Sequence, residues 1–415
     1  MIIGFDDTDS KKGMCTTYLA AVLIERLQKY GDIGIPLLIR LNPTIKYKTR
    51  GNAAIALQIK TSHVEEVEEI TVQAIEELSE LKEENTNPGV VFCEEVPEEV
   101  HIFSERTIKT TMRIDEARKI MAKYGLYHKG FKNQRGLIGA LAAIGAKLDD
   151  YTYELITYRY RDRWASQREI NKESVFLADR ETYPMTWDTV DVSNGKIVFA
   201  PNSKCPVLYG IRGGDMDAIY RAHEIIESEA AYRSILFKTN QGTDTHLMHG
   251  VIGEVREGCS YILRGNISEA PYTIEGGHVI FRISDGSEYI DCAAFEPTKN
   301  FREIIRRLGE DDEVVAYGSV NNSTLNLEKI EIKRLEEKTL FINPKCPVCA
   351  KSMKSEGSGK GYRCKRCKTH ADEKEVILIE RGIEPGLYEV PPVARRHISK
   401  PLVREENNRT VHPSR

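Results

Sequence analysis

The sequence contains no run of about 18 consecutive apolar residues, and so it predicts no membrane-spanning helix. Its first residues, MIIGFDDTDS, have no basic segment and carry early acids, which is not typical of a secretory signal peptide. These two absences favour a cytoplasmic protein with no membrane partner. A Walker A motif and the dinucleotide-binding glycine fingerprint are also missing, so a site for ATP would have to be of another kind.

The sequence also has few paired cysteines and a small net charge. It contains nine cysteines, which is an odd number, and five of them are scattered. This pattern does not suit a disulfide framework and fits a reducing compartment. The net charge of −4 argues against a protein that simply coats nucleic acid. Lys and Arg are nevertheless concentrated in residues 345–368 and 391–415, so the C-terminal part is basic.

Four cysteines form two CxxC pairs, CPVC and CKRC, at the spacing of a zinc ribbon. Each pair turns the backbone so that two thiolates point at one ion, and four thiolates complete a tetrahedron. Because no coordination position then remains for a substrate, the zinc would be structural. A redox pair or free cysteines are the alternative. The predicted zinc ligands are Cys346, Cys349, Cys364 and Cys367.

The N-terminal strand ends in an acidic loop, FDDTDS. Three carboxylates, from Asp6, Asp7 and Asp9, are costly to crowd together unless a cation such as Mg²⁺ lies among them, typically with phosphates. The residues that follow, Gly13 to Thr17, begin a helix whose N-terminus favours phosphate. Carboxylates, hydroxyls and a helix N-terminus together indicate phosphoryl transfer from ATP. The alternative is an exposed turn with an aspartate cap.

Two basic runs supply cations suited to a triphosphate. The run RLNPTIKYKTRGN begins at Arg40 and contains Lys48 and Arg50. The run HKGFKNQRG contains Lys132 and Arg135 and precedes an apolar helix. A solvated basic loop is the alternative in each case. With the helix start included, the predicted ATP- and phosphate-binding residues are Gly13, Thr17, Lys48, Arg50, Lys132 and Arg135.

Hydrophobic patterns divide the chain into five regions. Residues 1–110 and 111–235 mix helices and strands, and the second unit suits a ferredoxin-like sandwich. Residues 245–335 contain three strands, a helix and two strands, the order of an OB-fold, with another small β-barrel as the alternative. The ribbon occupies 340–375, and the prolines of 376–415 favour an extended basic arm. The predicted fold class is multidomain α/β (α+β), and an OB-fold beside a basic ribbon favours nucleic-acid binding.

Several of these runs occur together in one known family. The runs IGFDDTDSKKGMCTTYLA, IRLNPTIKYKTRGN and RRHISKPLV, with the OB unit and the CxxC ribbon, resemble the archaeal agmatinylcytidine synthetases over nearly the whole chain. That family modifies the wobble cytidine of an isoleucine tRNA with a CAU anticodon. The resemblance implies that 1–110 is a kinase-like catalytic domain, followed by a ferredoxin-like domain, an OB-fold that binds tRNA and a zinc ribbon.

The resemblance also implies the reaction. The carbonyl at position two of the wobble cytosine is phosphorylated at the expense of ATP, and the primary amine of agmatine then displaces the phosphate. The product pairs with A, so that the tRNA reads the codon AUA. Carried over by position, the catalytic aspartates are Asp6, Asp7 and Asp9, which would hold Mg²⁺, and the autophosphorylated threonine of GMCTT is Thr16.

Two other functions remain open on the residues alone. One is a DxD-type phosphohydrolase acting on RNA or nucleotides, for which Asp7-Thr8-Asp9 would serve as the motif. The other is a non-catalytic RNA-binding protein, against which the acidic loop argues because RNA repels clustered carboxylates. The expected partners are tRNA, ATP and agmatine, and no feature of the sequence indicates an obligate protein partner.

Overall fold

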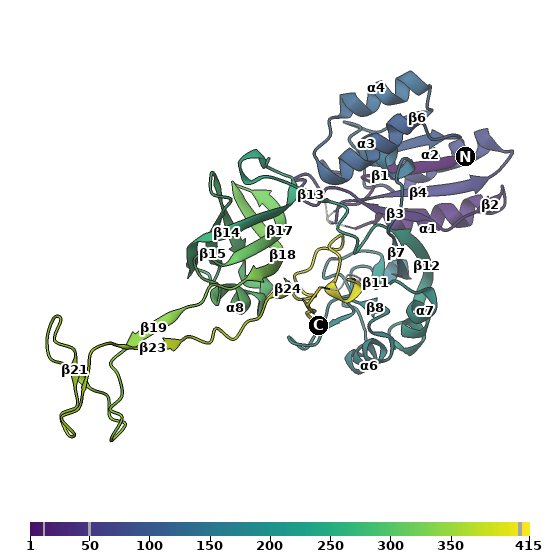
Figure 1. Cartoon of the computed structure of the whole chain (residues 1–415). Coiled ribbons are helices and arrows are strands. Elements are labelled where there is room, and N and C mark those ends of the chain that lie inside the picture. The colour runs from purple at the N-terminus through teal and green to yellow at the C-terminus, as the bar shows by residue number, and fades with distance from the viewer. Residues whose placement is uncertain (11–12, 49–50, 406–408) are drawn as a thin grey trace.

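The structure is a computed structural model that describes residues 1–10, 13–48, 51–405 and 409–415. An α/β body built from the N-terminal half of the chain lies beside a β-barrel, and a narrow ribbon extends away from the barrel (Figure 1). The chain end returns to the region between the barrel and the body. Among the described residues, no helix has the length and apolar character needed to cross a membrane.

The first part of the body is a sheet with helices on both faces. Helix α1 packs with the Ile3 and Phe5 face of the first strand, while α5 packs on the opposite face. Its elements are β1 (Ile2–Asp6), α1 (Thr16–Leu27), β2 (Asp32–Ile33), β3 (Leu37–Arg40), β4 (Ala53–Lys60), α2 (Val64–Leu78), β5 (Gly89–Cys93), α3 (Glu98–Lys109), α4 (Ile114–Tyr124), β6 (His128–Gly130) and α5 (Gly136–Ile144). The acidic loop therefore begins where a fully covered central strand ends.

The second part of the body continues the same sheet. Its elements are β7 (Thr152–Arg159), η1 (Arg161–Arg163), α6 (Lys172–Thr182), β8 (Thr186–Trp187), β9 (Val190–Asp191), β10 (Lys196–Ile197), β11 (Val207–Gly213), α7 (Met216–Ile225) and β12 (Ala231–Thr239). Strand β12 pairs in parallel with β3, with Lys238 opposite Leu37, and gives the order β6-β5-β1-β4-β3-β12-β7-β11-β8. One continuous sheet thus joins the two units, and the limits predicted for them stay predictions.

The barrel is closed by five strands. Strand β17 pairs with both β14 and β18, and β18 runs parallel to β16, which is the strand arrangement of an OB-fold. Its elements are β13 (Leu247–His249), η2 (Ile252–Glu254), β14 (Ser260–Thr273), β15 (Val279–Ser284), β16 (Tyr289–Ala294), η3 (Glu296–Thr298), α8 (Phe301–Arg306), β17 (Glu313–Asn321) and β18 (Thr324–Arg334). The structure confirms the predicted mixed α/β fold class with an OB-type barrel.

The ribbon stands on a two-stranded stalk and the chain then returns. Thr339 pairs with Leu378, so the ribbon begins and ends at one base. Its strands are β19 (Thr339–Ile342), β20 (Lys354–Ser355), β21 (Tyr362–Arg363), β22 (His370–Ala371) and β23 (Glu375–Leu378). The returning chain contains β24 (Gly386–Glu389), η4 (Leu402–Arg404) and β25 (Val411–His412), of which β24 pairs with the barrel strand β18.

Candidate active site

A cavity of about 880 Å³ opens where the two halves of the body, the barrel and the returning chain meet. Such a volume suits a small-molecule or cofactor site. Distant parts of the sequence contribute to its lining. They include Asp6, Asp7, Asp9, Thr16, Thr17, Arg40, Lys48, Arg135, Glu154, Phe199, Arg212, Glu257 and His397.

The acidic loop lies in this cavity and is held tightly. The Asp6 carboxylate accepts a hydrogen bond from the backbone N–H of Asp7 at 2.7 Å, and Arg135 donates to Asp7 Oδ2 at 2.8 and 3.1 Å. A side chain at Gly139 of α5 would collide with Asp6, because a Cβ there would lie 1.9 Å from Oδ2. The local packing therefore requires glycine at this position.

Burial dominates the electrostatics of these carboxyls. It raises the pKa of Asp6 well above its ordinary value, and the neighbouring Asp7 raises it further. Burial also raises the pKa of Asp7 to about 6, although Arg135 opposes the rise. Carboxylates that are costly to ionise are stabilised by a cation, and the hard oxygen donors of this loop fit Mg²⁺.

The start of α1 lies beside the acidic loop. The Thr8 hydroxyl donates to Thr16 Oγ1 at 3.1 Å, and Thr17 Oγ1 lies 3.1 Å from Cys15 Sγ. Both threonines of the helix start are buried, and the first turn contains no acidic residue. The partial positive charge of the helix N-terminus is thus directed at the cavity without an acidic side chain to neutralise it.

The basic side chains predicted to bind phosphate do not all lie in the cavity. Arg135 and Lys48 line the cavity, and burial together with the nearby Arg396 lowers the pKa of Lys48. The Lys132 ammonium instead donates to backbone carbonyls, including that of Thr86 at 2.9 Å. Within the described parts of the chain, neither Lys132 nor Gly13 lines the cavity. Arg50 lies outside the described residues.

A polar cluster around Glu154 in the cavity lining was not among the predicted site residues. Glu154 of β7 lies between two arginines, with Oε1 3.3 Å from Arg212 Nε and Oε2 3.8 Å from Arg40 Nη2. Gln241 donates to Glu154 Oε2 at 2.5 Å. His397, from the returning chain, contacts Arg40. The one signal in the sequence was a carboxylate inside the otherwise uncharged strand YTYELITY.

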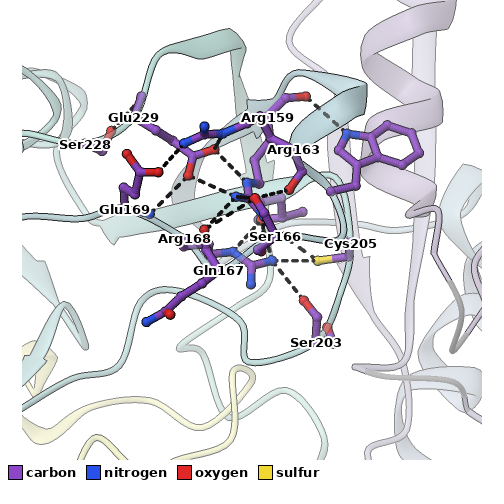
Figure 2. A network of polar contacts seen from close by, with 12 residues as sticks. Arg159, Arg163, Ser166, Gln167, Arg168, Glu169, Ser203, Cys205, Ser228 and Glu229 are labelled. Carbon is purple, nitrogen blue, oxygen red and sulfur yellow. Dashed lines mark hydrogen bonds and ion pairs between the residues drawn. The ribbon is translucent and has the colours of Figure 1, made fainter.

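A network of polar contacts around Arg159 and Arg168 reaches Cys205 (Figure 2). Arg159, whose side chain is fully buried, makes a bidentate pair with Glu229 at 2.8 and 2.9 Å. Arg168 donates to the Val207 carbonyl at 2.8 Å and lies 3.2 Å from Cys205 Sγ. Because Cys205 and Val207 line the cavity, this network sets the position of the wall.

The four cysteines of the ribbon fit one metal ion. Their sulfur atoms all lie within 4.8 Å of one another, in the group Cys346, Cys349, Cys364 and Cys367. The sulfur atoms of Cys349 and Cys364 are 3.6 Å apart. A tetrahedron with zinc–sulfur distances of about 2.3 Å has edges of roughly 3.8 Å, so the donor set fits zinc.

We expect Cys364→Ser to lose the zinc and to destabilise the ribbon, because a fourth thiolate closes the tetrahedron. None of the four ribbon cysteines lines the cavity, so the chemistry of the cavity should survive. Metal analysis of the purified protein measures the result. Cys93→Ser, which changes a cysteine of the body, should keep one zinc ion per chain. Full zinc retention by the Cys364 variant would overturn the assignment.

The fold and the site together define a class of protein. An acidic loop beside a helix N-terminus belongs to phosphate chemistry, and an OB-type barrel with a basic zinc ribbon belongs to nucleic-acid binding. Both features share one chain, and barrel residues line the cavity. The protein is therefore of the class of nucleic-acid-modifying enzymes.

Comparisons with known proteins identify the family. Family models match residues 2–63 (TiaS TCKD domain), 134–246 (TiaS FLD domain) and 343–383 (TiaS C-terminal zinc ribbon domain). The chain is 51% identical over 428 residues to the tRNA(Ile2) 2-agmatinylcytidine synthetase TiaS of Methanosarcina acetivorans, with 100% of both proteins covered. The chain thus belongs to the TiaS family, which confirms the predicted resemblance.

Solved structures agree with this assignment. The crystal structure of apo TiaS has a TM-score of 0.95 at 47% identity and covers 100% of this chain and 99% of its own. The structure of a TiaS–tRNA(Ile2)–AMPCPP–agmatine complex has a TM-score of 0.89 at 45% identity, with the same coverage. The likeness therefore extends over all parts of the fold, including the barrel and the ribbon.

Proposed function

We propose that the protein is an ATP-dependent ligase that attaches agmatine to position two of the wobble cytidine of isoleucine tRNA. The observation that supports this function most strongly is the full-length similarity to TiaS proteins. The cavity joins an acidic loop, a helix N-terminus and a barrel, which suits such a reaction. A phosphohydrolase or a non-catalytic RNA-binding protein gains no support from these relatives. The tRNA substrate favours the cytoplasm as the place of the reaction.

The reaction proceeds in two steps. The carbonyl oxygen of the cytosine first takes a phosphoryl group from ATP, which turns a poor leaving group into a good one. The primary amine of agmatine then attacks the carbon at position two, the C–N bond forms, and the C–O bond breaks with the departing phosphate. The attacking nitrogen gives up one proton in this step, and the departing phosphate takes it up. The base must leave its stack to react, and a cavity wall with Phe199 can hold it.

The residues of the cavity divide this work. Asp6, Asp7 and Asp9 would hold Mg²⁺, which supplies charge stabilisation at the transferred phosphoryl group. The backbone N–H groups at the start of α1, beside Thr17, bind phosphate oxygens. Lys48 and Arg135 add positive charge around the triphosphate. The guanidinium of agmatine requires a carboxylate, and Glu154 and Glu257 lie in the lining.

One reaction mixture tests the function. The protein is incubated with ATP, Mg²⁺, agmatine and unmodified isoleucine tRNA, and the digested nucleosides are analysed by mass spectrometry. We expect a cytidine that carries agmatine, and none when agmatine or ATP is omitted. Phosphate release without any modified nucleoside would instead favour the phosphohydrolase.

We also expect Thr16 to take phosphate from ATP. Its hydroxyl lies at the helix start, where the N-terminal dipole stabilises a phosphate, and it lines the cavity with the aspartates. Peptide mass spectrometry after incubation with ATP locates the phosphate. Thr16→Ala should abolish the signal, whereas the control Thr61→Ala, which changes a threonine just after β4, should keep it on Thr16. Phosphate on another residue alone contradicts the assignment.

A further inference from the structure

The chain that follows the ribbon is docked into the body rather than free. We call residues 390–405 the return segment. The backbone N–H of Gly242 donates to the His397 carbonyl at 2.8 Å. Arg395, with 2% of its side chain exposed, pairs with Asp188 of the body and with Glu389 of the barrel edge at 2.8 Å. The return segment therefore has a fixed position between barrel and body.

This docking places one side chain in the cavity. His397 Nδ1 lies 3.2 Å from Arg40 Nη2 and 3.1 Å from Gln241 Oε1. Burial, with the charges of Arg212 and Arg40, holds the pKa of His397 well below its ordinary value, so the imidazole is neutral. An arginine can only donate, so Nδ1 accepts from Arg40 in the tautomer whose proton is on Nε2, whereas in the other tautomer Nδ1 would donate to Gln241 Oε1. The Nε2 tautomer is the one in which His397 can hold Arg40.

Gln241 supports the same guanidinium nitrogen. Its Oε1 accepts from Arg40 Nη2 at 3.3 Å, while its amide nitrogen donates to Glu154. Two acceptors from distant parts of the chain thus hold one Nη2. Together they restrain this end of the guanidinium.

The opposite side of Arg40 has different surroundings. Its Nε is buried and has no hydrogen-bond partner among the described residues. Its Nη1 is directed at Gly51, where a Cβ would lie only 2.5 Å away. Gly51 also lines the cavity and follows the basic loop. The guanidinium therefore keeps donor capacity for an anion on the side away from His397.

We propose that His397 is a positioning residue of the active site, which holds the guanidinium of Arg40 ready for the phosphates of ATP. The inference rests on the proposed function for the identity of the anion. It makes the return segment, encoded after the zinc ribbon, a part of the ATP site and not only a connection to the barrel.

Variants of His397 separate positioning from simple packing. His397→Leu keeps bulk but removes the acceptor, and we expect the KM for ATP to rise roughly tenfold or more, as for other lost hydrogen bonds to charged groups. His397→Asn places an amide oxygen near the position of Nδ1 and should restore most of the affinity. Ser399→Ala loses the hydrogen bond from the return segment to Glu328, so it should lower the melting temperature without changing the KM.

A double variant tests whether His397 acts through Arg40. In an Arg40→Met background, adding His397→Leu should raise the KM for ATP by less than about threefold, because the acceptor has lost its donor. Equal defects in the Leu and Asn variants, a wild-type KM in the Leu variant, or fully additive effects would each overturn the proposal. Calorimetric ATP binding gives the same comparison without tRNA. If the wild-type protein bound ATP but left tRNA unmodified, the proposed function would fail while His397 could still be judged.

Discussion

Replacing Asp7 with asparagine is expected to slow ATP-dependent modification of tRNA by roughly a hundredfold or more, if Asp7 is a direct ligand of the cation. Asparagine keeps the shape of the side chain but removes the charge. The change also removes the ion pair of Asp7 with Arg135, whose shorter contact is 2.8 Å. Affinity for tRNA should stay constant or rise slightly, because a charge that repels phosphate is gone.

Single-turnover rates with saturating ATP measure this effect, and filter binding measures tRNA affinity. Asp9→Asn and Asp6→Asn should behave alike, whereas Asp32→Asn, on an exposed strand of the same body, should not. Normal rates in all three loop variants would mean that the acidic loop is only a capped turn. The catalytic site would then have to be sought around Lys48 and Arg135. A defect in tRNA binding alone would contradict the metal role.

The pH dependence of cation binding gives a second measurement of the same loop. Burial raises the pKa of Asp7 to about 6, above that of an unfolded chain, so the folded state loses stability as the pH rises from about 4 to about 6, and the full cost remains at higher pH. A bound cation offsets this cost, and protons compete with it as the pH falls through about 6. The rise in melting temperature caused by Mg²⁺ should therefore be larger at pH 7.5 than at pH 5, and smaller in Asp7→Asn.

Removal of the ribbon is expected to weaken tRNA binding by roughly a hundredfold while ATP binding stays unchanged. Ile342 and Glu375 are cross-strand partners, so residues 343–374 can be replaced by a two-residue Asn-Gly turn. The excision removes exposed basic side chains, namely Lys351, Lys354, Lys360, Arg363, Lys365 and Arg366. Filter binding at several salt concentrations should show a shallower salt dependence for the excised chain.

Deleting everything from residue 340 to 415 would not test the ribbon cleanly. It would also remove β24 from the barrel sheet and His397 from the cavity. A matched control keeps the ribbon and replaces Lys360 and Lys365 with glutamine, which should produce part of the loss. Equal tRNA affinity for the intact and excised proteins would exclude the ribbon from tRNA binding.

Local patterns predicted the parts of the fold that depend on short stretches of chain. The cysteine spacing predicted the ribbon, and the order of three strands, a helix and two strands predicted the barrel. The acidic loop was also visible, because three carboxylates stand within four positions, from Asp6 to Asp9. The carboxylates of the loop and the cysteines of each CxxC pair are close in sequence, and the barrel follows from the order of its strands and helix, so composition and period suffice.

Long-range contacts could not be predicted in this way. The pairing of β3 with β12 depends on edges brought together by the whole body, and no period in either strand specifies the partner. Arg40 and His397 are 357 residues apart, and their contact exists only after barrel and body are docked. Lys132 lies in a basic run typical of a phosphate site, but its ammonium group donates hydrogen bonds to backbone carbonyls. The roles of the site residues stay predictions.

The position of His397 has a consequence for synthesis of the protein on the ribosome. The acidic loop and α1 emerge first, and domains generally fold as units in that order. The cavity is nevertheless lined by His397 of the return segment, which is synthesised after the barrel and the ribbon. A nascent chain therefore carries its aspartates through most of translation before His397 exists. If His397 positions Arg40 as proposed, the site is complete only when the barrel and ribbon that precede His397 have been made.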